Sequence, residues 1–237
     1  MIKRKYLYKY KSGNDLDLSA LKKDALWVSN YACLNDPSDF PIYSKSLSEE
    51  EIEDYYEAFR SSFSCISFSS TPYNRSLWNY YAGKMDGMVI AYQTKDIYKA
   101  LSDYGIKTLY SNSVAYDGKK FDFSKQISQG KFKDIDPDCF FHKDESWKQE
   151  KEYRFVFENP TKKDGFLLPV KPHHIFIGYR MGKKKTEEII EYCQKNNLYL
   201  YQIRPDHHSS DSSSYMKKIL YGKKSDQIGM DYEEKLK

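Results

Sequence analysis

The sequence lacks the cysteine spacing that marks a metal-binding or disulfide framework. Its four cysteines, Cys33, Cys65, Cys139 and Cys193, are widely separated and form no C-x-x-C pair. This spacing argues against a zinc knuckle and against a scaffold held by disulfides. We therefore expect reduced thiols in a cytoplasmic protein.

Long hydrophobic runs are missing as well. No apolar run follows the basic start, Met1-Ile2-Lys3-Arg4-Lys5, so a signal peptide is not expected, and no stretch reaches the length of a membrane span. The chain also contains no G-x-G-x-x-G fingerprint, so hydride transfer with a bound dinucleotide is not implied. We find no internal repeats.

A strong charge of one sign is absent too. The 38 basic and 34 acidic residues interleave to a net charge of +4, which permits polyanion binding without arguing for it. Aromatic residues are plentiful instead, with 23 Tyr and 13 Phe, and they supply apolar area for a core. The length predicts one domain over residues 1–206. The polar composition after it predicts a C-terminal tail over 207–237, with a short possible helix within 215–221.

Periodicity predicts short strands and helices in mixed order. The main strands are expected at 6–10, 63–69, 87–92, 153–157, 175–178 and 198–203, and helices at 19–26, 76–82, 96–104 and 186–194. A capping box, Ser48-x-x-Glu51, predicts a further helix. The order has no βαβ regularity. It therefore predicts an α+β fold with mixed, mainly antiparallel sheets and short flanking helices.

The most informative stretch is 147–157, where two glutamates stand two residues apart at the start of an alternating strand. Side chains two apart in a strand point the same way, so Glu150, Glu152 and Arg154 are expected on one face. The opposite face then carries Tyr153, Phe155 and Phe157. Neighbouring like charges repel, and Arg154 relieves this only in part. Such a pair is either solvated at a strand end or placed to act on a ligand.

Six ordered blocks resemble a bacterial and phage family catalogued as domain of unknown function 2971. The blocks are 7–10 (LYKY), 26–29 (LWVS), 35–39 (NDPSD), 65–69 (CISFS), 77–82 (LWNYYA) with Gly87, and Trp147 with 150–154 (EKEYR). Residues 175–178 (IFIG) fit a weaker seventh block. The resemblance runs from about residue 6 to residue 203. The family name carries no activity.

The opening strand, turn and helix are also similar to the start of ADP-ribosyltransferase domains. That resemblance implies an NAD-contacting residue on the first strand, where Lys9 stands in place of the usual Arg or His. It implies small hydroxyl residues on a later strand, which Ser67 and Ser69 match. It also implies a catalytic Glu within an E-x-E motif, which Glu150 and Glu152 match.

The resemblance implies NAD as a substrate and a role for each matched residue. Glu152 would stabilise positive charge on the ribose as nicotinamide leaves, and Glu150 would act as general base on the acceptor. The expected cofactor-binding residues are Lys9 at the pyrophosphate, Ser67 and Ser69 at the ribose or at Glu152, Trp78 or Tyr81 stacked on nicotinamide, and Arg154 beside the glutamates.

Other interpretations remain open at this stage. Lys9 fits a solvated strand residue, and Trp78 and Tyr81, at i and i+3, fit a helix core. The adjacent pairs His173-His174 and His207-His208 point apart in a strand, so no metal site is expected, and His142 is an isolated candidate base.

Two further functions compete with the enzyme, so catalysis itself stays open. The chain could be a non-catalytic binding module of a phage-defence or counter-defence system, with Lys183–Lys185 and Lys217-Lys218 holding protein or nucleic acid. A nuclease is the weakest candidate, because no group of carboxylates and lysine suited to a metal stands out. The sequence leaves the acceptor and the oligomeric state open.

Overall fold

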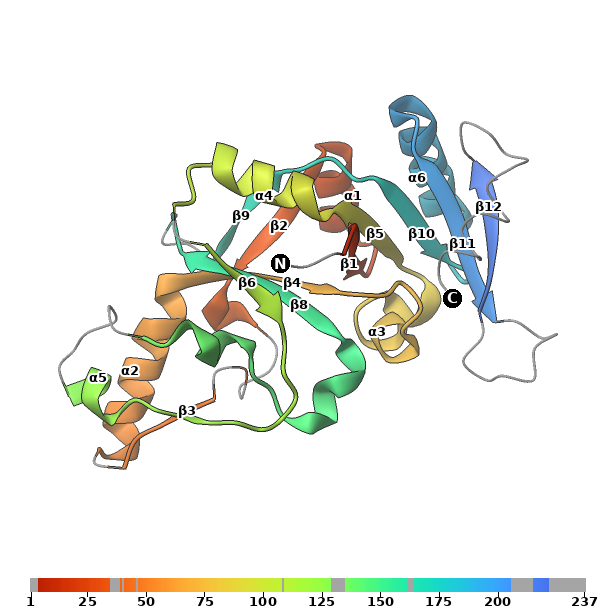
Figure 1. Ribbon diagram of the computed structural model, residues 1–237. Coiled ribbons are helices and arrows are strands. Elements are labelled where there is room, and N and C mark those ends of the chain that lie inside the picture. The colour runs from red at the N-terminus through yellow and green to blue at the C-terminus, as the bar shows by residue number, and fades with distance from the viewer. Residues whose placement is uncertain are drawn as a thin grey trace. The chain divides into compact units, whose positions relative to one another are not determined.

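The computed structural model describes residues 4–34, 39, 41–45, 47–107, 109–128, 135–161, 164–205 and 215–221 of the 237-residue chain (Figure 1). The chain divides into two compact units, each built from separate segments. Unit 1 comprises Met1–Ala25, Ser69–Tyr98 and Pro169–Lys237. Unit 2 comprises Leu26–Phe68 and Lys99–Leu168.

Unit 1 is organised around a five-stranded arrangement. Its strands are β1 (Tyr6–Lys11), β5 (Met88–Gln93), β10 (His174–Gly178), β11 (Tyr199–Pro205) and β12 (Tyr215–Tyr221). They lie in the order β12-β11-β10-β5-β1, and every pairing except the parallel one between β10 and β11 is antiparallel. Tyr8 of β1 also pairs with Ser69.

The helical elements of unit 1 are short. They are α1 (Asp15–Lys22), α3 (Arg75–Tyr80), the 3-10 helix η2 (Gly83–Met85), α6 (Lys183–Asn196) and the first half of α4 (Thr94–Asp103). Helix α1 begins four residues before the predicted start at Ser19. The Asn14 side chain, which we expected in a turn, caps it by accepting a hydrogen bond from the Asp17 amide at 2.9 Å.

The core of unit 1 is an aromatic layer between the strands and α3. Trp78 is fully buried in it, and its indole Nε1 donates to the Pro72 carbonyl at 2.8 Å. The Tyr10 ring lies edge-on to Trp78, and the Tyr10 hydroxyl donates to the Thr71 carbonyl at 2.9 Å. These two polar contacts fix the 71–74 segment while the rings fill the core.

Unit 2 is organised around a second set of strands. They are β2 (Ala25–Asn30), β4 (Phe63–Ser69), β6 (Leu109–Ser113), β8 (Glu152–Glu158) and β9 (Gly165–Pro169). Strand β8 pairs with β4 and β6, β4 pairs with β2, and β2 pairs with β9. A separate parallel pair joins β3 (Ile42–Tyr43) to β7 (Phe121–Asp122). The helical elements are α2 (Glu49–Ser62), α5 (Ser124–Ser128), η1 (Tyr31–Cys33), η3 (Pro137–Phe141) and η4 (Glu145–Glu150).

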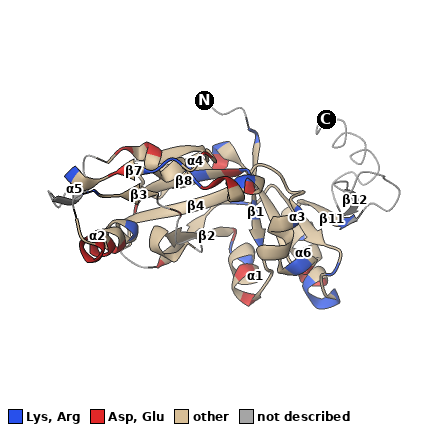
Figure 2. Cartoon of the chain, turned by 90° about the horizontal axis from the view of Figure 1, so that it is seen from below, with Lys and Arg blue, Asp and Glu red and all other residues tan. Residues whose placement is uncertain are grey.

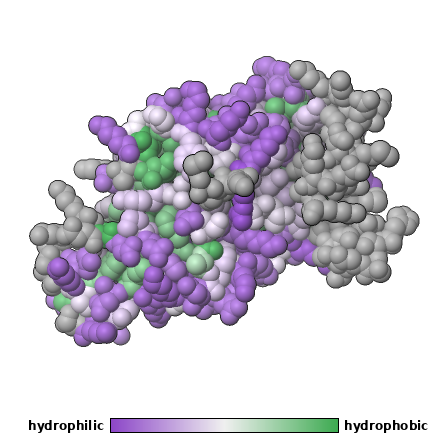
Figure 3. Space-filling model, viewed as in Figure 1, coloured by the Kyte–Doolittle hydropathy of each residue, from purple (hydrophilic) through white to green (hydrophobic). Residues whose placement is uncertain are grey.

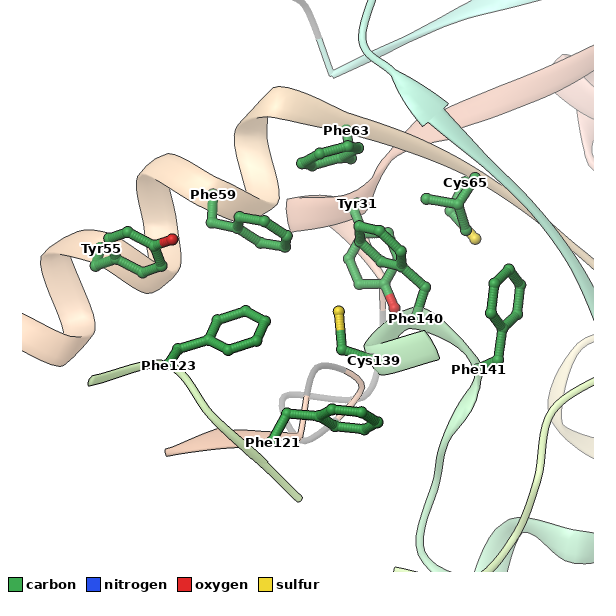
Figure 4. Close-up of a cluster of buried hydrophobic side chains, with 11 residues drawn as sticks. Tyr31, Tyr55, Phe59, Phe63, Cys65, Phe121, Phe123, Cys139, Phe140 and Phe141 are labelled. Atoms are coloured by element: carbon green, nitrogen blue, oxygen red, sulfur yellow. The ribbon is translucent and has the colours of Figure 1, made fainter. Parts of the chain in front are cut away.

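Helix α2 forms where the capping box predicts it. Ser48 and Glu51 exchange hydrogen bonds at its start, and the helix buries Tyr55 and Phe59. In Figure 4 these rings meet those of β4 and η3: Phe59 is stacked on Phe140 with centroids 5.7 Å apart and lies 4.8 Å from Phe63. This aromatic core supports the face of β8 that carries the candidate site.

The structure confirms an α+β fold with mainly antiparallel pairing and short helices. It corrects two local predictions. Region 118–146, expected as loop, contributes β7, α5 and the buried η3. The segment 215–221 forms strand β12 and not a helix, because the edge of β11 offers backbone partners along its length. The domain boundary at residue 206 stays a prediction.

Charged residues cover most of the exposed surface. Figure 2 shows an acidic first turn on α2, with Glu49, Glu50 and Glu51, and basic residues at the start of α6. Hydrophilic side chains also dominate the face in Figure 3, where apolar patches are small. Over the described residues, no helix has both the length and the apolar composition to cross a bilayer.

We predict that Gly178→Ala destabilises unit 1, because a Cβ there would lie 2.0 Å from the carbonyl oxygen of Met85. Neither backbone can move aside cheaply, so the cost should be about 2 kcal/mol. Urea unfolding measures it. Gly182→Ala is the matched control, since a Cβ at Gly182 meets nothing within 4 Å. Equal losses in both variants would contradict the close contact.

Candidate active site

The two glutamates predicted to share a face converge by a route that strand alternation does not describe. Glu150 ends η4 and Glu152 begins β8, while Lys151 between them adopts a left-handed backbone with φ of 48°. This turn brings both carboxylates to one ammonium, that of Lys143. Both are buried, with 8% and 5% of the residue exposed, so the expected solvated strand end is not observed.

Arg154 lies at the centre of this arrangement and is fully buried. Its Nε donates to Glu152 Oε1 at 2.8 Å, and one terminal nitrogen donates to Glu152 Oε2 at 3.0 Å and to Asp39. The other terminal nitrogen donates to the Tyr31 hydroxyl and the Phe140 carbonyl, both at 2.9 Å. A guanidinium has five N–H donors, and all five are used. Arg154 therefore has none left for a cofactor, which corrects its predicted cofactor-binding role.

Lys143 joins the carboxylates that Arg154 does not neutralise. Its Nζ lies 3.0 Å from Glu152 Oε2, 3.1 Å from Glu150 Oε2 and 3.2 Å from Asp39 Oδ1. We call these five buried residues, Asp39, Lys143, Glu150, Glu152 and Arg154, the ion cluster. It contains three carboxylates and two cations.

The cluster holds its two glutamates in different electrostatic environments. Burial works to raise the pKa of Glu152, but Arg154 and Lys143 outweigh burial and hold that pKa well below its usual range. Burial raises the pKa of Glu150, and Lys143 offsets this only in part. Pairs of carboxyl groups whose environments separate their pKa values are typical of acid–base sites.

A strap of chain around Tyr116 holds both Lys143 and Glu152 in place. The Glu152 amide donates to the Tyr116 hydroxyl at 2.8 Å, and the Val114 amide donates to the Glu152 carbonyl at 3.1 Å. The Lys143 amide donates to the Ala115 carbonyl at 2.9 Å. Burial raises the pKa of Tyr116 to about 12, so its hydroxyl stays protonated. These bonds fix the backbone from which both charged groups project.

Of the predicted hydroxyl residues, Ser67 belongs to this site. It is partly exposed on β4, and its side chain hydrogen-bonds the Glu152 carboxylate. Its hydroxyl also lies 3.6 Å from the Cys65 sulfur. Ser67 thus holds Glu152, as one of its two predicted roles requires.

The other predicted site residues lie in unit 1. Lys9 is half-buried and pairs with Ile90 across β1 and β5, and Ser69 is buried with its hydroxyl accepting from the Thr71 amide at 3.4 Å. Trp78 is a core residue, so the interpretation as helix core describes it better than a ligand platform. Tyr81 is partly buried against the same core. That Lys9 and Ser69 share a site with Glu152 stays a prediction.

The histidines do not form a metal site. Among the described residues, no group of three or more His, Cys, Asp or Glu side chains is placed to hold a metal ion. His142 lies between two carboxylates, with Nδ1 2.7 Å from Asp117 and Nε2 3.1 Å from Asp138. The Nδ1 atoms of His173 and His174 are 2.9 Å apart, and His207-His208 lie outside the described residues.

Sequence reasoning missed four residues of the site: Asp39, Lys143, Tyr31 and Tyr116. Asp39 was expected only as a cap after the 35–37 turn, which lies outside the described residues. Lys143 was placed in a polar loop. One signal was available for it, because the preceding Phe140-Phe141 pair is apolar enough to bury the segment. Tyr31 and Tyr116 gave no signal among 23 tyrosines.

Comparison with known proteins supports the first family resemblance over part of the chain. Residues 77–155 match the model of a family described as "Protein of unknown function (DUF2971)". The matched stretch contains the fifth and sixth sequence blocks, Lys143 and the E-x-E motif, so the resemblance is confirmed there. No curated protein matches the chain.

One solved structure is similar in its course: DarT of Thermus sp. 2.9, in complex with ADP-ribosylated single-stranded DNA. The similarity covers 82% of this chain and 90% of that one, at 9% sequence identity and a TM-score of 0.37. The function proposed below rests instead on the side chains of unit 2.

We predict opposite tolerance of the two glutamates to an isosteric neutral change. Glu152→Gln places an amide N–H against the donors of Arg154 or Lys143 and should cost about 3 kcal/mol, as when one partner of a buried ion pair is removed. Glu150→Gln keeps an oxygen for its single Lys143 contact and should change stability by less than about 1 kcal/mol. Urea unfolding at pH 7 measures both. Equal losses would contradict the different environments.

The same pair predicts a pH dependence with two signs. Because the pKa of Glu152 is lowered on folding, its stabilising contribution is present above the ordinary value of 4.5 and is lost as pH falls below it. Because the pKa of Glu150 is raised, its contribution is present below 4.5 and is lost as pH rises through the folded value. Melting temperatures from pH 3 to 7 should show the Glu152→Gln deficit shrinking towards acid. Glu150→Gln should gain on wild type as pH rises. Parallel curves for all three proteins would rule this out.

Proposed function

We propose that this protein is an NAD-dependent ADP-ribosyltransferase-like enzyme, with Glu152 and Glu150 as its catalytic pair. The acceptor is a group on a protein or a nucleic acid, and the expected setting is conflict between phage and host. The proposal joins the E-x-E motif of the sequence to the environment in which unit 2 places it.

One observation carries the proposal: two neighbouring carboxylates bind the same ammonium, and their pKa values are displaced in opposite directions. A carboxylate kept ionised near a reacting carbon can stabilise developing positive charge. A second carboxyl group with a raised pKa can accept and release a proton near the operating pH. Cleavage at a sugar carbon needs both kinds of group.

The roles follow from the bonds that change. The bond between nicotinamide and the ribose breaks, nicotinamide leaves with the bonding electrons, and positive charge develops on the ribose. Glu152 stabilises that charge. Glu150 removes the proton from the acceptor O–H or N–H, the acceptor forms a bond to the ribose carbon, and the proton passes to solvent. The products are nicotinamide, ADP-ribosylated acceptor and one proton.

Substrate can approach Glu152 only by taking over one of its present contacts. Arg154 binds both carboxylate oxygens and is itself held by five hydrogen bonds, so it stays. Lys143 shares only Oε2, and its ammonium has two other carboxylates to bind. We propose that the ribose displaces the Lys143 contact while Arg154 holds Glu152 in orientation.

The remaining contacts to NAD are proposed from the resemblance. Lys9 would meet the pyrophosphate as a point charge. Ser69 would add a hydroxyl at the ribose, and Tyr81 is the more exposed of the two aromatic residues offered for nicotinamide, since Trp78 is fully buried.

The alternative of a non-catalytic binding module is less well supported. It relied on the basic run at the start of α6, but Lys185 pairs with Asp86 at 2.9 Å and Lys183 lies 3.8 Å from Glu187. These pairs reduce the charge that the run offers to a polyanion. The side chains of Lys217 and Lys218 lie outside the described part of the chain.

The test is nicotinamide release from NAD by the purified protein, with mass spectrometry for ADP-ribose added to protein or to single-stranded oligonucleotides. Wild type should release nicotinamide. Glu152→Gln should lose at least about 100-fold of the rate, the usual effect of removing a group that stabilises transition-state charge. Glu152→Asp keeps the charge on a shorter arm and should retain part of the activity.

Glu158→Gln is the matched control, because Glu158 is the exposed carboxylate at the other end of β8. Circular dichroism at the assay temperature confirms that each variant is folded. Full activity in folded Glu152→Gln would remove Glu152 from the mechanism. Absence of nicotinamide release from wild type with every acceptor class would favour the binding module.

A further inference from the structure

A single ammonium connects the two glutamates. Lys143 Nζ has three N–H donors and lies within 3.2 Å of three carboxylate oxygens from three residues, Asp39, Glu150 and Glu152. The Trp147 ring covers a further side of the ammonium, with its centroid 5.2 Å away. The Lys143 side chain is only 6% exposed, so this geometry replaces its hydration shell.

The charge balance of the ion cluster depends on this residue. Three buried carboxylates face two buried cations, and an unpaired buried charge is strongly unfavourable. Arg154 contacts Asp39 and Glu152 but makes no printed contact with Glu150. Lys143 is thus the cation that faces Glu150 directly, at 3.1 Å.

We propose that Lys143 is the positioning residue that couples Glu150 to Glu152, so that Glu150 exchanges its proton near the working pH while Glu152 stays ionised. The role deepens the proposed function, on which its catalytic meaning rests, because general-base work by Glu150 needs this division. A proton taken up by Glu150 releases part of the Lys143 charge to Glu152 and Asp39. Loss of that proton draws the ammonium back.

The groups that face Glu150 agree with this role. Lys143 favours its ionised form, whereas Glu152 and Asp39 disfavour it, and the Tyr116 phenol lies near enough to be affected by both glutamates. Burial lowers the pKa of Lys143, but the three carboxylates outweigh burial and hold it above its ordinary value. Lys143 therefore stays charged throughout the range in which Glu150 titrates. Removing it leaves Glu150 facing two carboxylates without a cation.

The test is carboxyl-carbon NMR of protein labelled at glutamate, with signals assigned from Glu150→Gln and Glu152→Gln. Lys143→Met removes the charge at similar length and should raise the titration midpoint of Glu150 by at least about 1 pH unit, the usual effect of a close opposite charge. Lys143→Arg should restore most of the shift. Lys148→Met is the control, because Lys148 is exposed and contacts only Glu145 in the described structure.

A second readout works on the unaltered protein. The Lys143 amine nitrogen signal should move with the same midpoint as Glu150. An unmoved Lys143 signal in wild type, or an unchanged Glu150 midpoint in folded Lys143→Met, would overturn the coupling.

Turnover separates the coupling from the proposed function. If the enzyme is active, the acid limb of its pH–rate profile should move to higher pH in Lys143→Met and return in Lys143→Arg. An immobile acid limb would also overturn the coupling. If both NMR signals behave as expected but wild type releases no nicotinamide, the coupling stands and the proposed function fails.

Discussion

The buried guanidinium of Arg154 is the constraint on which the rest of unit 2 depends. A charge in that position is tolerated only because every donor has an acceptor, and those acceptors come from η1, residue 39, η3 and β8. Four segments far apart in sequence must therefore meet at one place. The aromatic core beneath them supplies the apolar contacts, while Arg154 sets which polar groups face each other.

This constraint has a chemical consequence. Because Arg154 uses both oxygens of Glu152, that carboxylate is fixed in direction and kept ionised. The excess carboxyl group, Glu150, lies outside the reach of Arg154 and shares only Lys143. One member of the pair thus provides a fixed charge, and the other provides a proton site. The left-handed turn at Lys151 makes this possible, since a continuous strand would give both glutamates the same relation to Arg154.

Much of the architecture was predictable because its signals are local. The capping box at Ser48 fixed the start of α2, and the apolar run at 63–69 gave β4 with its observed bounds. Strand alternation also placed Glu152 and Arg154 on one face. Helix α1 was misplaced because Asn14 serves as an N-cap, and the pattern there equally fits a turn.

The parts that were missed depend on distant partners. Strand β6 reads Leu-Tyr-Ser-Asn-Ser, which has weak strand character, and it forms by pairing with β8. Asp39 and Lys143 are charged residues in segments that read as loops, and only Arg154 and the glutamates explain their burial. No spacing rule joins residues 39, 143 and 154, so the candidate site could be predicted only for its contiguous half.

The central claim is that Glu152 acts on the ribose of NAD, and a crystal structure with a non-cleavable NAD analogue tests it most directly. The quantity to measure is the distance from the Glu152 carboxylate to the ribose carbon that bears nicotinamide. We predict a separation of about 3–3.5 Å, with Arg154 unmoved and the Lys143 contact to Glu152 broken. An analogue bound away from β8, or a ribose held while Lys143 keeps all three carboxylates, would contradict the claim.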